Sequence, residues 1–335
     1  MNIKRILILL IIPIFAFAQL DNALKLHPEM NGWNTDTMSL HANIGANIWR
    51  TTIQATANDD TSEFLLMNHD WANRWLGELS LNSVDSLDWY TSDPEFNAKI
   101  ITPVTENNYY TFRMKDNGYS NTVGVVLETS APPVNITDVS LSPDTVLAED
   151  EVTVNITLDN SPCAEEIIYV RYTTDNWQSH NFVEATGSGT DYTATLPAQS
   201  PGTNLNLYVL TTTLNWSNSN DLENYPDLMS LRTNTNSGNN YSYAVNSPPV
   251  INAPEDQEIL EGETLDMELT ANDPDQDDLN WTALNLPNTA NFTDNGDGTA
   301  QLIWTPDYDE QGQYTITIIV DDGKSETAQT FNMEP

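Results

Sequence analysis

Short runs of residues that alternate between apolar and polar recur along this chain and constrain its fold more than any other feature. Three examples, each rich in β-branched or aromatic residues, are 152–158, 167–172 and 314–320. An alternation with a period of two places successive side chains on opposite faces of a strand. Turn-forming residues separate such runs every eight to twelve positions, and no long segment after residue 18 has a helical period. The sequence therefore predicts an all-β fold built from sandwiches.

The first eighteen residues, Met1–Ala18, have the pattern of a cleaved export signal. Lys4 and Arg5 precede an apolar run, Ile6–Phe17, and small residues follow at its end. A membrane anchor is the alternative, but the run contains Pro13 and is shorter than the roughly twenty apolar residues that a spanning helix needs. We expect a mature chain that is extracellular or at the cell surface, with no integral membrane segment.

Two Pro-Pro pairs divide the remainder, at Pro132-Pro133 and Pro248-Pro249. Proline fixes φ and removes a backbone donor, so a Pro-Pro step suits a stiff linker better than a central strand. The predicted units are 19–131, 132–246 and 247–335. Together with the strand pattern, this predicts three tandem β-sandwich domains after the signal peptide.

The charge of the chain is strongly negative and unevenly shared. Of its 335 residues, 49 are acidic and 11 are Lys or Arg, which gives a formal net charge of −38. Nucleic acid is therefore excluded as an expected partner, because its backbone is bound by basic side chains. The unit 247–335 contains 20 acidic residues and a single base, Lys324. Carboxylates clustered in loops make a cation site the first hypothesis for that unit, and a solvated acidic turn is the alternative.

Calcium is the cation that this chemistry favours. Ca²⁺ takes six to eight oxygen ligands, and Asp273, Asp275 and Asp277 at i, i+2 and i+4 can converge from one loop. The EF-hand pattern is absent, because its central Gly and its final bidentate Glu are missing.

Residues 247–335 also contain signals of an immunoglobulin-like sandwich. The spacing of Asp309, Gly312 and Tyr314 is typical of a tyrosine corner, in which the Tyr hydroxyl bonds back to the backbone before a strand. Trp281 fits the buried aromatic of a central strand, and Asn295-Gly296-Asp297-Gly298 fits a tight turn. These signals predict an immunoglobulin-like sandwich for this unit, and we expect all three tandem domains to be immunoglobulin-like.

A family resemblance covers nearly all of this unit. Its motifs are Pro248-Pro249-Val250-Ile251, Glu261-Gly262-Glu263, Asp273-Pro274-Asp275-Gln276-Asp277-Asp278-Leu279, Trp304-Thr305-Pro306 and Asp321-Asp322-Gly323. They resemble the bacterial and dystroglycan-type cadherin-like domains. The resemblance implies a spacer or adhesion module that holds calcium, with Glu261, Asp321 and Asp322 approaching the loop of Asp273, Asp275 and Asp277. One departure is Gln276, which stands where the family usually has Gly.

The unit 19–131 resembles a different family. Five of the nine Trp lie there, and the segments Asn31-Gly32-Trp33, Ile48-Trp49-Arg50 and Asp70-Trp71 are similar to the glycogen- and starch-binding sandwiches that accompany amylases. The resemblance implies that Trp33 and Trp71 stack on glucose rings. The amides of Asn31 and Asn73 can hydrogen-bond sugar hydroxyls. A Lys that the family often places near the strand of Glu63-Phe64 is missing, and the alternative is that these Trp belong to a core.

The unit 132–246 carries weaker motifs. Its runs around Tyr169–Trp177, Gly187–Ala194 and Leu207–Thr212 are similar to early-set and starch-binding-like sandwiches. Trp177, in a predicted loop with amide neighbours, is a further candidate for sugar contact, and a spacer sandwich is the alternative. The pair Glu165-Glu166 is expected at a solvated strand edge.

No catalytic residue can be assigned. Motifs such as G-x-S-x-G, H-E-x-x-H and phosphate loops are absent, and the single Cys163 is expected to be a partly buried thiol. We expect a non-catalytic exported glycan-binding protein with a calcium-binding module, whose partner is a polysaccharide such as an α-glucan. One alternative is a cell-surface adhesion or structural module with protein partners. Another is the N-terminal accessory region of a secreted amylase-type glycoside hydrolase.

Overall fold

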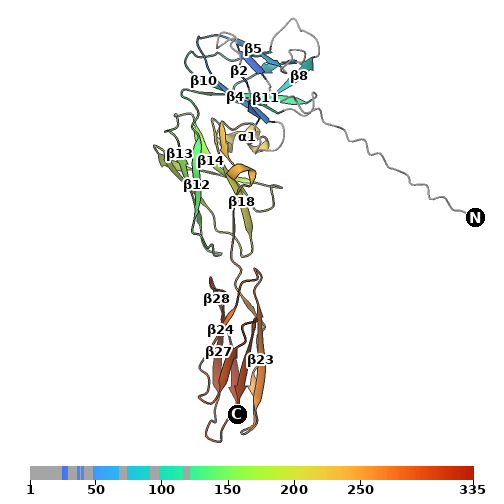
Figure 1. Cartoon of the computed structure of the whole chain (residues 1–335), viewed down its shortest axis with the longest axis vertical. Helices are drawn as coiled ribbons and strands as arrows, with labels where there is room; N and C mark the ends of the chain where they lie inside the picture. Colours follow the sequence, from blue (N-terminus) through green and yellow to red (C-terminus); the bar gives the residue numbers. More distant parts are fainter. Residues whose placement is uncertain are drawn as a thin grey trace, which may run out of the picture. The chain divides into compact units, whose positions relative to one another are not determined.

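The structure is a computed structural model that describes residues 25–28, 36–37, 39–40, 48–67, 74–90, 98–115 and 121–335 (Figure 1). Strands dominate these residues, and the few helices are a single turn or little more. Among the described residues, none forms a helix with the length and hydropathy that crossing a bilayer requires. The predicted signal peptide, Met1–Ala18, lies outside the described residues. The all-β class expected from the alternating runs is confirmed.

The chain forms two compact units. One contains Met1–Ile136, Asp159–Ile168 and Leu210–Gly238, and the other contains Thr137–Leu158, Tyr169–Val209 and Asn239–Pro335. The strands of residues 136–244 therefore contribute to both units. The division into three domains at the Pro-Pro pairs stays a prediction.

The described residues before 130 form one sheet of eleven strands in the order β2-β1-β5-β6-β8-β11-β10-β4-β3, with β9 pairing β5 and β7. Its core contains Trp75, Phe64 and Tyr110, which are almost completely buried. Trp49 is also buried, as a core residue would be. The strands are β1 (Lys25–Pro28), β2 (Asp36–Thr37), β3 (Ser39–Leu40), β4 (Ile48–Gln54), β5 (Ser62–Met67), β6 (Arg74–Leu76), β7 (Glu78–Leu79), β8 (Asp85–Tyr90), β9 (Ala98–Ile100), β10 (Tyr109–Lys115) and β11 (Thr122–Thr129).

Two further sheets follow, in the orders β12-β13-β17-β16 and β15-β14-β18-β19, and β20 also pairs with β18. Short helices α1 (Asn220–Asn224), η2 (Trp216–Asn218) and η3 (Asn236–Gly238) lie near β19 in the sequence. The strands are β12 (Ile136–Ser142), β13 (Val152–Leu158), β14 (Ile167–Thr173), β15 (Asn181–Glu184), β16 (Thr186–Ser188), β17 (Asp191–Leu196), β18 (Asn204–Thr212), β19 (Arg232–Asn234) and β20 (Tyr241–Ala244).

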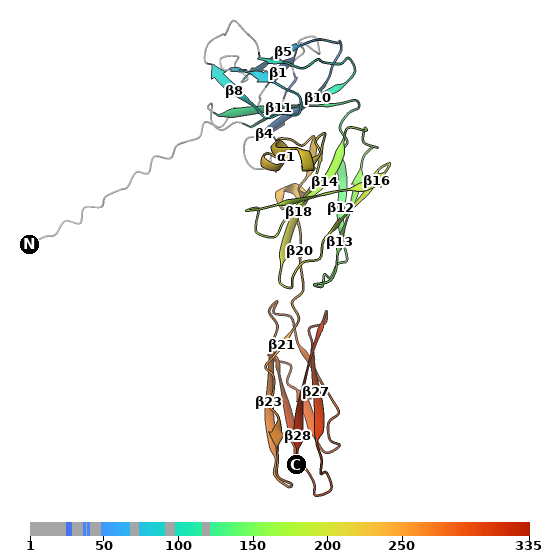
Figure 2. The same ribbon diagram turned by 180° about the vertical axis from the view of Figure 1, so that it is seen from behind.

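The last residues form a two-sheet sandwich, called here the C-terminal sandwich. Its sheets have the orders β21-β23-β26-β25 and β22-β28-β27-β24, and both views show β23, β27 and β28 running along its length (Figures 1 and 2). The strands are β21 (Val250–Ile251), β22 (Gln257–Glu258), β23 (Leu265–Asn272), β24 (Asn280–Leu284), β25 (Asn291–Asp294), β26 (Thr299–Trp304), β27 (Tyr314–Asp321) and β28 (Glu326–Glu334).

Alternation explains how this sandwich buries its core. In β27, Ile316, Ile318 and Val320 are completely buried, while Thr317 and Ile319 between them are partly exposed. Period-two burial of this kind is what one face of a strand in a sandwich requires. Trp304 and Phe331 complete the core from β26 and β28. The strands predicted at 152–158, 167–172 and 314–320 are confirmed as β13, β14 and β27.

The predicted immunoglobulin-like details of this sandwich are confirmed. The Tyr314 hydroxyl donates to the backbone oxygen of Glu310 over 3.3 Å, which is the tyrosine corner. Trp281 is 6% exposed within β24. The tight turn before β26 has Gly296 at φ 74° and Gly298 at φ 84°, and these positive angles are ones that glycine adopts without strain.

The prediction that Glu165 and Glu166 form a solvated edge was wrong for Glu166. Glu165 is exposed, but Glu166 is only 6% exposed and accepts the backbone N–H of Val134 over 3.2 Å. Burial raises the pKa of Glu166, and the Val134 hydrogen bond and the charge of Arg232 partly oppose that effect. The adjacent acidic pair gave no sign that one of its members points inward.

Candidate cation site at one end of the C-terminal sandwich

Strand register brings two acidic segments to the same end of the C-terminal sandwich. Asp273 follows the last residue of β23, and Asp277 lies shortly before β24. Because β24 and β27 are antiparallel with Asn280 opposite Asp321, the start of β24 lies beside the end of β27. Asp322, the next residue after β27, therefore lies close to the loop that contains Asp273 and Asp277.

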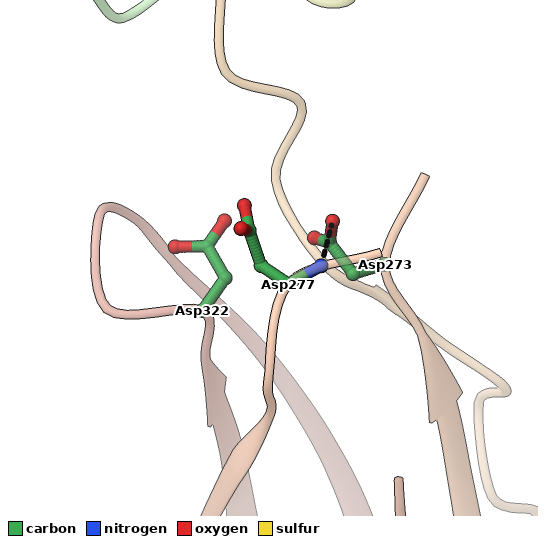
Figure 3. Close-up of side chains that lie close together, drawn as sticks. All are labelled: Asp273, Asp277 and Asp322. Carbon is green, nitrogen blue, oxygen red and sulfur yellow. Dashed lines mark hydrogen bonds between the residues drawn. The ribbon is translucent and has the colours of Figure 1, made fainter. Parts of the chain in front are cut away.

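The carboxylates of these three residues converge. Asp273, Asp277 and Asp322 each offer one oxygen, and these oxygens all lie within 4.8 Å of one another. Figure 3 shows the three side chains pointing to the same side of their loops. Ligand oxygens on opposite sides of a calcium ion are about 5 Å apart, since each Ca–O distance is about 2.5 Å. The spacing is therefore suitable for one shared ion. We call these three residues the aspartate cluster.

A turn within the 273–277 loop orients two members of the cluster. The Asp273 side chain accepts the backbone N–H groups of Asp275 over 2.8 Å and of Asp277 over 3.2 Å. Gln276, between them, has φ 67°, the left-handed conformation that glycine adopts more easily. The Gly-to-Gln departure therefore leaves this loop in the glycine-like conformation, at a cost in strain.

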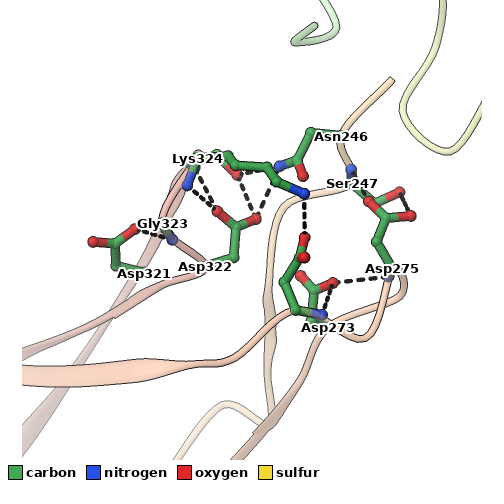
Figure 4. Close-up of polar contacts among 10 residues, drawn as sticks. Asn246, Ser247, Asp273, Asp275, Asp321, Asp322, Gly323 and Lys324 are labelled. Carbon is green, nitrogen blue, oxygen red and sulfur yellow. Dashed lines mark hydrogen bonds and ion pairs between the residues drawn. The ribbon is translucent and has the colours of Figure 1, made fainter. Parts of the chain in front are cut away.

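Asp322 is held from several directions (Figure 4). Its side chain accepts the backbone N–H groups of Lys324 and Ser325, the Ser325 hydroxyl and the Asn246 amide, and the Asn246 bond is 2.9 Å long. Burial acts to raise the pKa of Asp322, but the hydrogen bonds from Asn246, Ser325 and Lys324 outweigh it and hold the pKa below 3.8. Asp322 is therefore ionised at neutral pH although it is only 6% exposed.

Asn246 also belongs to this site, although nothing in the sequence pattern singles it out. Its side chain is 6% exposed, and its amide nitrogen donates to Asp322 and to the Ser325 hydroxyl. Its side-chain oxygen is buried and has no hydrogen-bond partner among the described residues, and the same is true of Oδ2 of Asp273. Unpaired buried acceptors are costly and rare. Carboxylate and amide oxygens of this kind can coordinate a hard cation.

Lys324 supplies the only cation in this region of the sequence. Its Nζ lies 2.7 Å from Oδ2 of Asp277. That hydrogen bond raises the pKa of Lys324 above its ordinary value. The three carboxylates of the aspartate cluster thus face one ammonium, and an excess of negative charge remains.

Three of the six predicted ligands do not join the cluster. Asp275 turns to Ser247, from which it accepts the backbone N–H over 2.6 Å, and Asp321 accepts the N–H of Gly323 over 2.7 Å. Glu261 precedes β23 and Asp273 follows it, so the eight residues of β23 separate the two. At about 3.3 Å a residue, that strand keeps Glu261 at the opposite end of the sandwich. Glu261 is therefore not placed to share an ion with Asp273.

The predicted sugar-binding residues give no described site. Asn31, Trp33, Trp71 and Asn73 lie outside the described residues, and their role stays a prediction. The Trp177 ring is half-buried, with the Arg171 guanidinium 4.7 Å from its centre and the Tyr208 ring 5.5 Å away. The contact of Trp177 with a sugar stays a prediction.

The family comparison supports the fold of residues 246–334. Residues 246–334 match the family model described as a bacterial Ig domain, and the comparison with curated proteins finds no match. Among solved structures, the I67–I69 fragment of the titin I-band is similar at 10% identity, covering 78% of this chain and 98% of the fragment with a TM-score of 0.36. An endo-fucoidan hydrolase of glycoside hydrolase family 107 is similar at 13% identity, covering 62% of this chain and 35% of the hydrolase with a TM-score of 0.24. The matched residues of this chain form an immunoglobulin-like sandwich, and the aspartate cluster lies within them.

Proposed function

We propose that this chain is an exported, non-catalytic structural or adhesive module whose C-terminal sandwich binds calcium at the aspartate cluster. The observation that carries the proposal is the convergence of Asp273, Asp277 and Asp322 beside a buried side-chain oxygen of Asn246 that has no hydrogen-bond partner among the described residues. Three carboxylates and one amide oxygen are hard ligands of the kind that Ca²⁺ prefers, and water can complete its coordination.

Calcium would stabilise the end of the sandwich. The cluster joins the loop between β23 and β24 to the turn after β27, so an ion shared by Asp273, Asp277 and Asp322 would link both sheets. It would also relieve repulsion among carboxylates that lie in a partly buried place. A ligand that binds only the folded state raises its stability, by about 2.7 kcal/mol when its concentration is 100 times Kd.

Thermal unfolding of the full chain tests the proposal. In millimolar CaCl₂, the transition of the C-terminal sandwich should move to a higher temperature than in EDTA. Asp277→Asn should abolish most of that increase, because it removes a ligand charge. Glu261→Gln is the matched control, since Glu261 lies at the other end of β23, and it should keep the full increase. An unchanged transition in wild-type protein would contradict the proposal.

A further inference from the structure

Lys324 lies beside the aspartate cluster, where its positive charge offsets part of the negative charge. Residues 247–335 contain 20 acidic residues and a single base, Lys324. Its Nζ lies 2.7 Å from Oδ2 of Asp277, a member of the aspartate cluster. Its backbone is fixed, because its N–H donates to Asp322 over 2.7 Å. Its side chain remains 38% exposed, so the ammonium can move while the turn stays in place.

An ammonium and a calcium ion compete for the same carboxylate, that of Asp277. The hydrogen bond from Lys324 uses Oδ2 of Asp277, which is one of the oxygens available to an ion. A calcium ion about 2.5 Å from Asp277 would lie within about 5 Å of Nζ if Lys324 kept its bond. Two like charges at that distance repel strongly in a partly buried site. Calcium binding and the Lys324–Asp277 bond therefore oppose each other.

We infer that Lys324 is a tethered counter-cation: it neutralises Asp277 when calcium is absent and is displaced when calcium binds, so it sets the calcium affinity of the site. This inference rests on the proposed function. The displaced side chain has other carboxylates nearby, because Lys324 lines a cavity together with Asp275, Asp277 and Asn246.

Removing the charge of Lys324 should have two opposite effects, on stability without calcium and on calcium affinity. Lys324→Met keeps the length of the side chain but removes its charge, and the calcium-free protein then has an uncompensated cluster and a lower melting temperature. The same change removes the competitor, so calcium should bind at least about tenfold more tightly. An ordinary surface ion pair would affect calcium affinity far less.

Isothermal titration of the full chain with CaCl₂, after removal of metal, measures these affinities. Lys324→Met should lower Kd at least about tenfold, whereas Lys324→Arg, which keeps the competing charge, should stay within about threefold of wild type. Lys115→Met changes the net charge equally but lies outside the C-terminal sandwich, and it should leave Kd unchanged.

The outcomes separate this inference from the proposed function. If wild type and Lys324→Met both bind calcium with the same Kd, the calcium site stands and the counter-cation role is wrong. Weaker binding by Lys324→Met would also overturn the inference. If neither protein binds calcium at millimolar concentration, the proposed function fails and this inference fails with it.

Discussion

Charged side chains are held inside the described residues in two different ways. Around residues 230–232, arginines donate to neutral oxygens: Arg113 to the backbone oxygen and hydroxyl of Ser230, Arg50 to the Leu231 oxygen over 3.2 Å, and Arg232 to Asn135 over 3.1 Å. At the aspartate cluster, carboxylates accept from amides and hydroxyls, yet buried oxygens of Asp273 and Asn246 have no hydrogen-bond partner in the described part of the chain.

The difference supports the proposal that the aspartate cluster binds a cation, whereas the arginine region holds cations of its own. Burial lowers the pKa of Arg50 to about 10, with help from the charge of Arg232, but the group stays protonated at neutral pH and its Nη1 donates to the Leu231 oxygen. Beside the aspartate cluster lies one exposed ammonium, that of Lys324, and buried oxygens of Asp273 and Asn246 have no hydrogen-bond partner among the described residues. A bound cation would supply a partner for those oxygens.

The largest expected effect is in the arginine region. Arg113 is 1% exposed in β10, and Arg113→Met leaves the oxygen of Ser230 without its donor. We expect a loss of about 3 kcal/mol of unfolding free energy, equal in EDTA and in calcium. Lys115→Met in the same strand should cost less than about 0.5 kcal/mol. Chemical denaturation measures both losses. A loss in Arg113→Met that depends on calcium would show that the arginine region is not independent of the aspartate cluster.

The next largest expected effect is a dependence of folding stability on pH that comes from Glu166. Burial raises the pKa of Glu166, so its contribution to stability is complete below its unfolded pKa of about 4.5 and is lost as the pH rises through the folded pKa. Glu166→Gln should remove that part of the pH dependence and become progressively favoured over wild type as the pH rises above about 4.5. Glu165→Gln is the exposed control. Parallel stability curves for wild type and Glu166→Gln would show that Glu166 does not titrate as described.

The tyrosine corner is expected to contribute about 1 kcal/mol. Tyr314→Phe removes the hydrogen bond to Glu310 but keeps the ring, whose centre lies 5.3 Å from that of Trp304. Tyr308→Phe is the control, since Tyr308 is 79% exposed. Equal melting temperatures for the two variants would mean that the corner is dispensable.

The smallest expected effect is a gain of stability in the acidic loop that contains Gln276. Gln276 has φ 67°, so Gln276→Gly relieves strain and should raise stability by about 0.5 kcal/mol after the added chain entropy is subtracted. Gln311→Gly, in a loop position without a positive φ, should instead lower stability. A loss of stability in Gln276→Gly would show that the loop does not hold this conformation in solution.

The fold was largely predictable, because alternation and the tyrosine-corner spacing are local signals. The site was predictable only in part. The i, i+2, i+4 pattern identified Asp273 and Asp277, but Asp275 is used by Ser247. Adjacent residues at a strand end point to opposite faces, so only Asp322 of the pair 321–322 could join. Asn246 is distant in sequence and carries no motif.

The most direct measurement is the anomalous difference density of crystals of the full chain grown with CaCl₂. We expect a calcium peak at the aspartate cluster, with oxygens of Asp273, Asp277 and Asp322 about 2.3 to 2.6 Å from it, and Lys324 Nζ no longer bonded to Asp277. An aspartate cluster with no peak, in which Lys324 still lies against Asp277, would contradict the proposed calcium site.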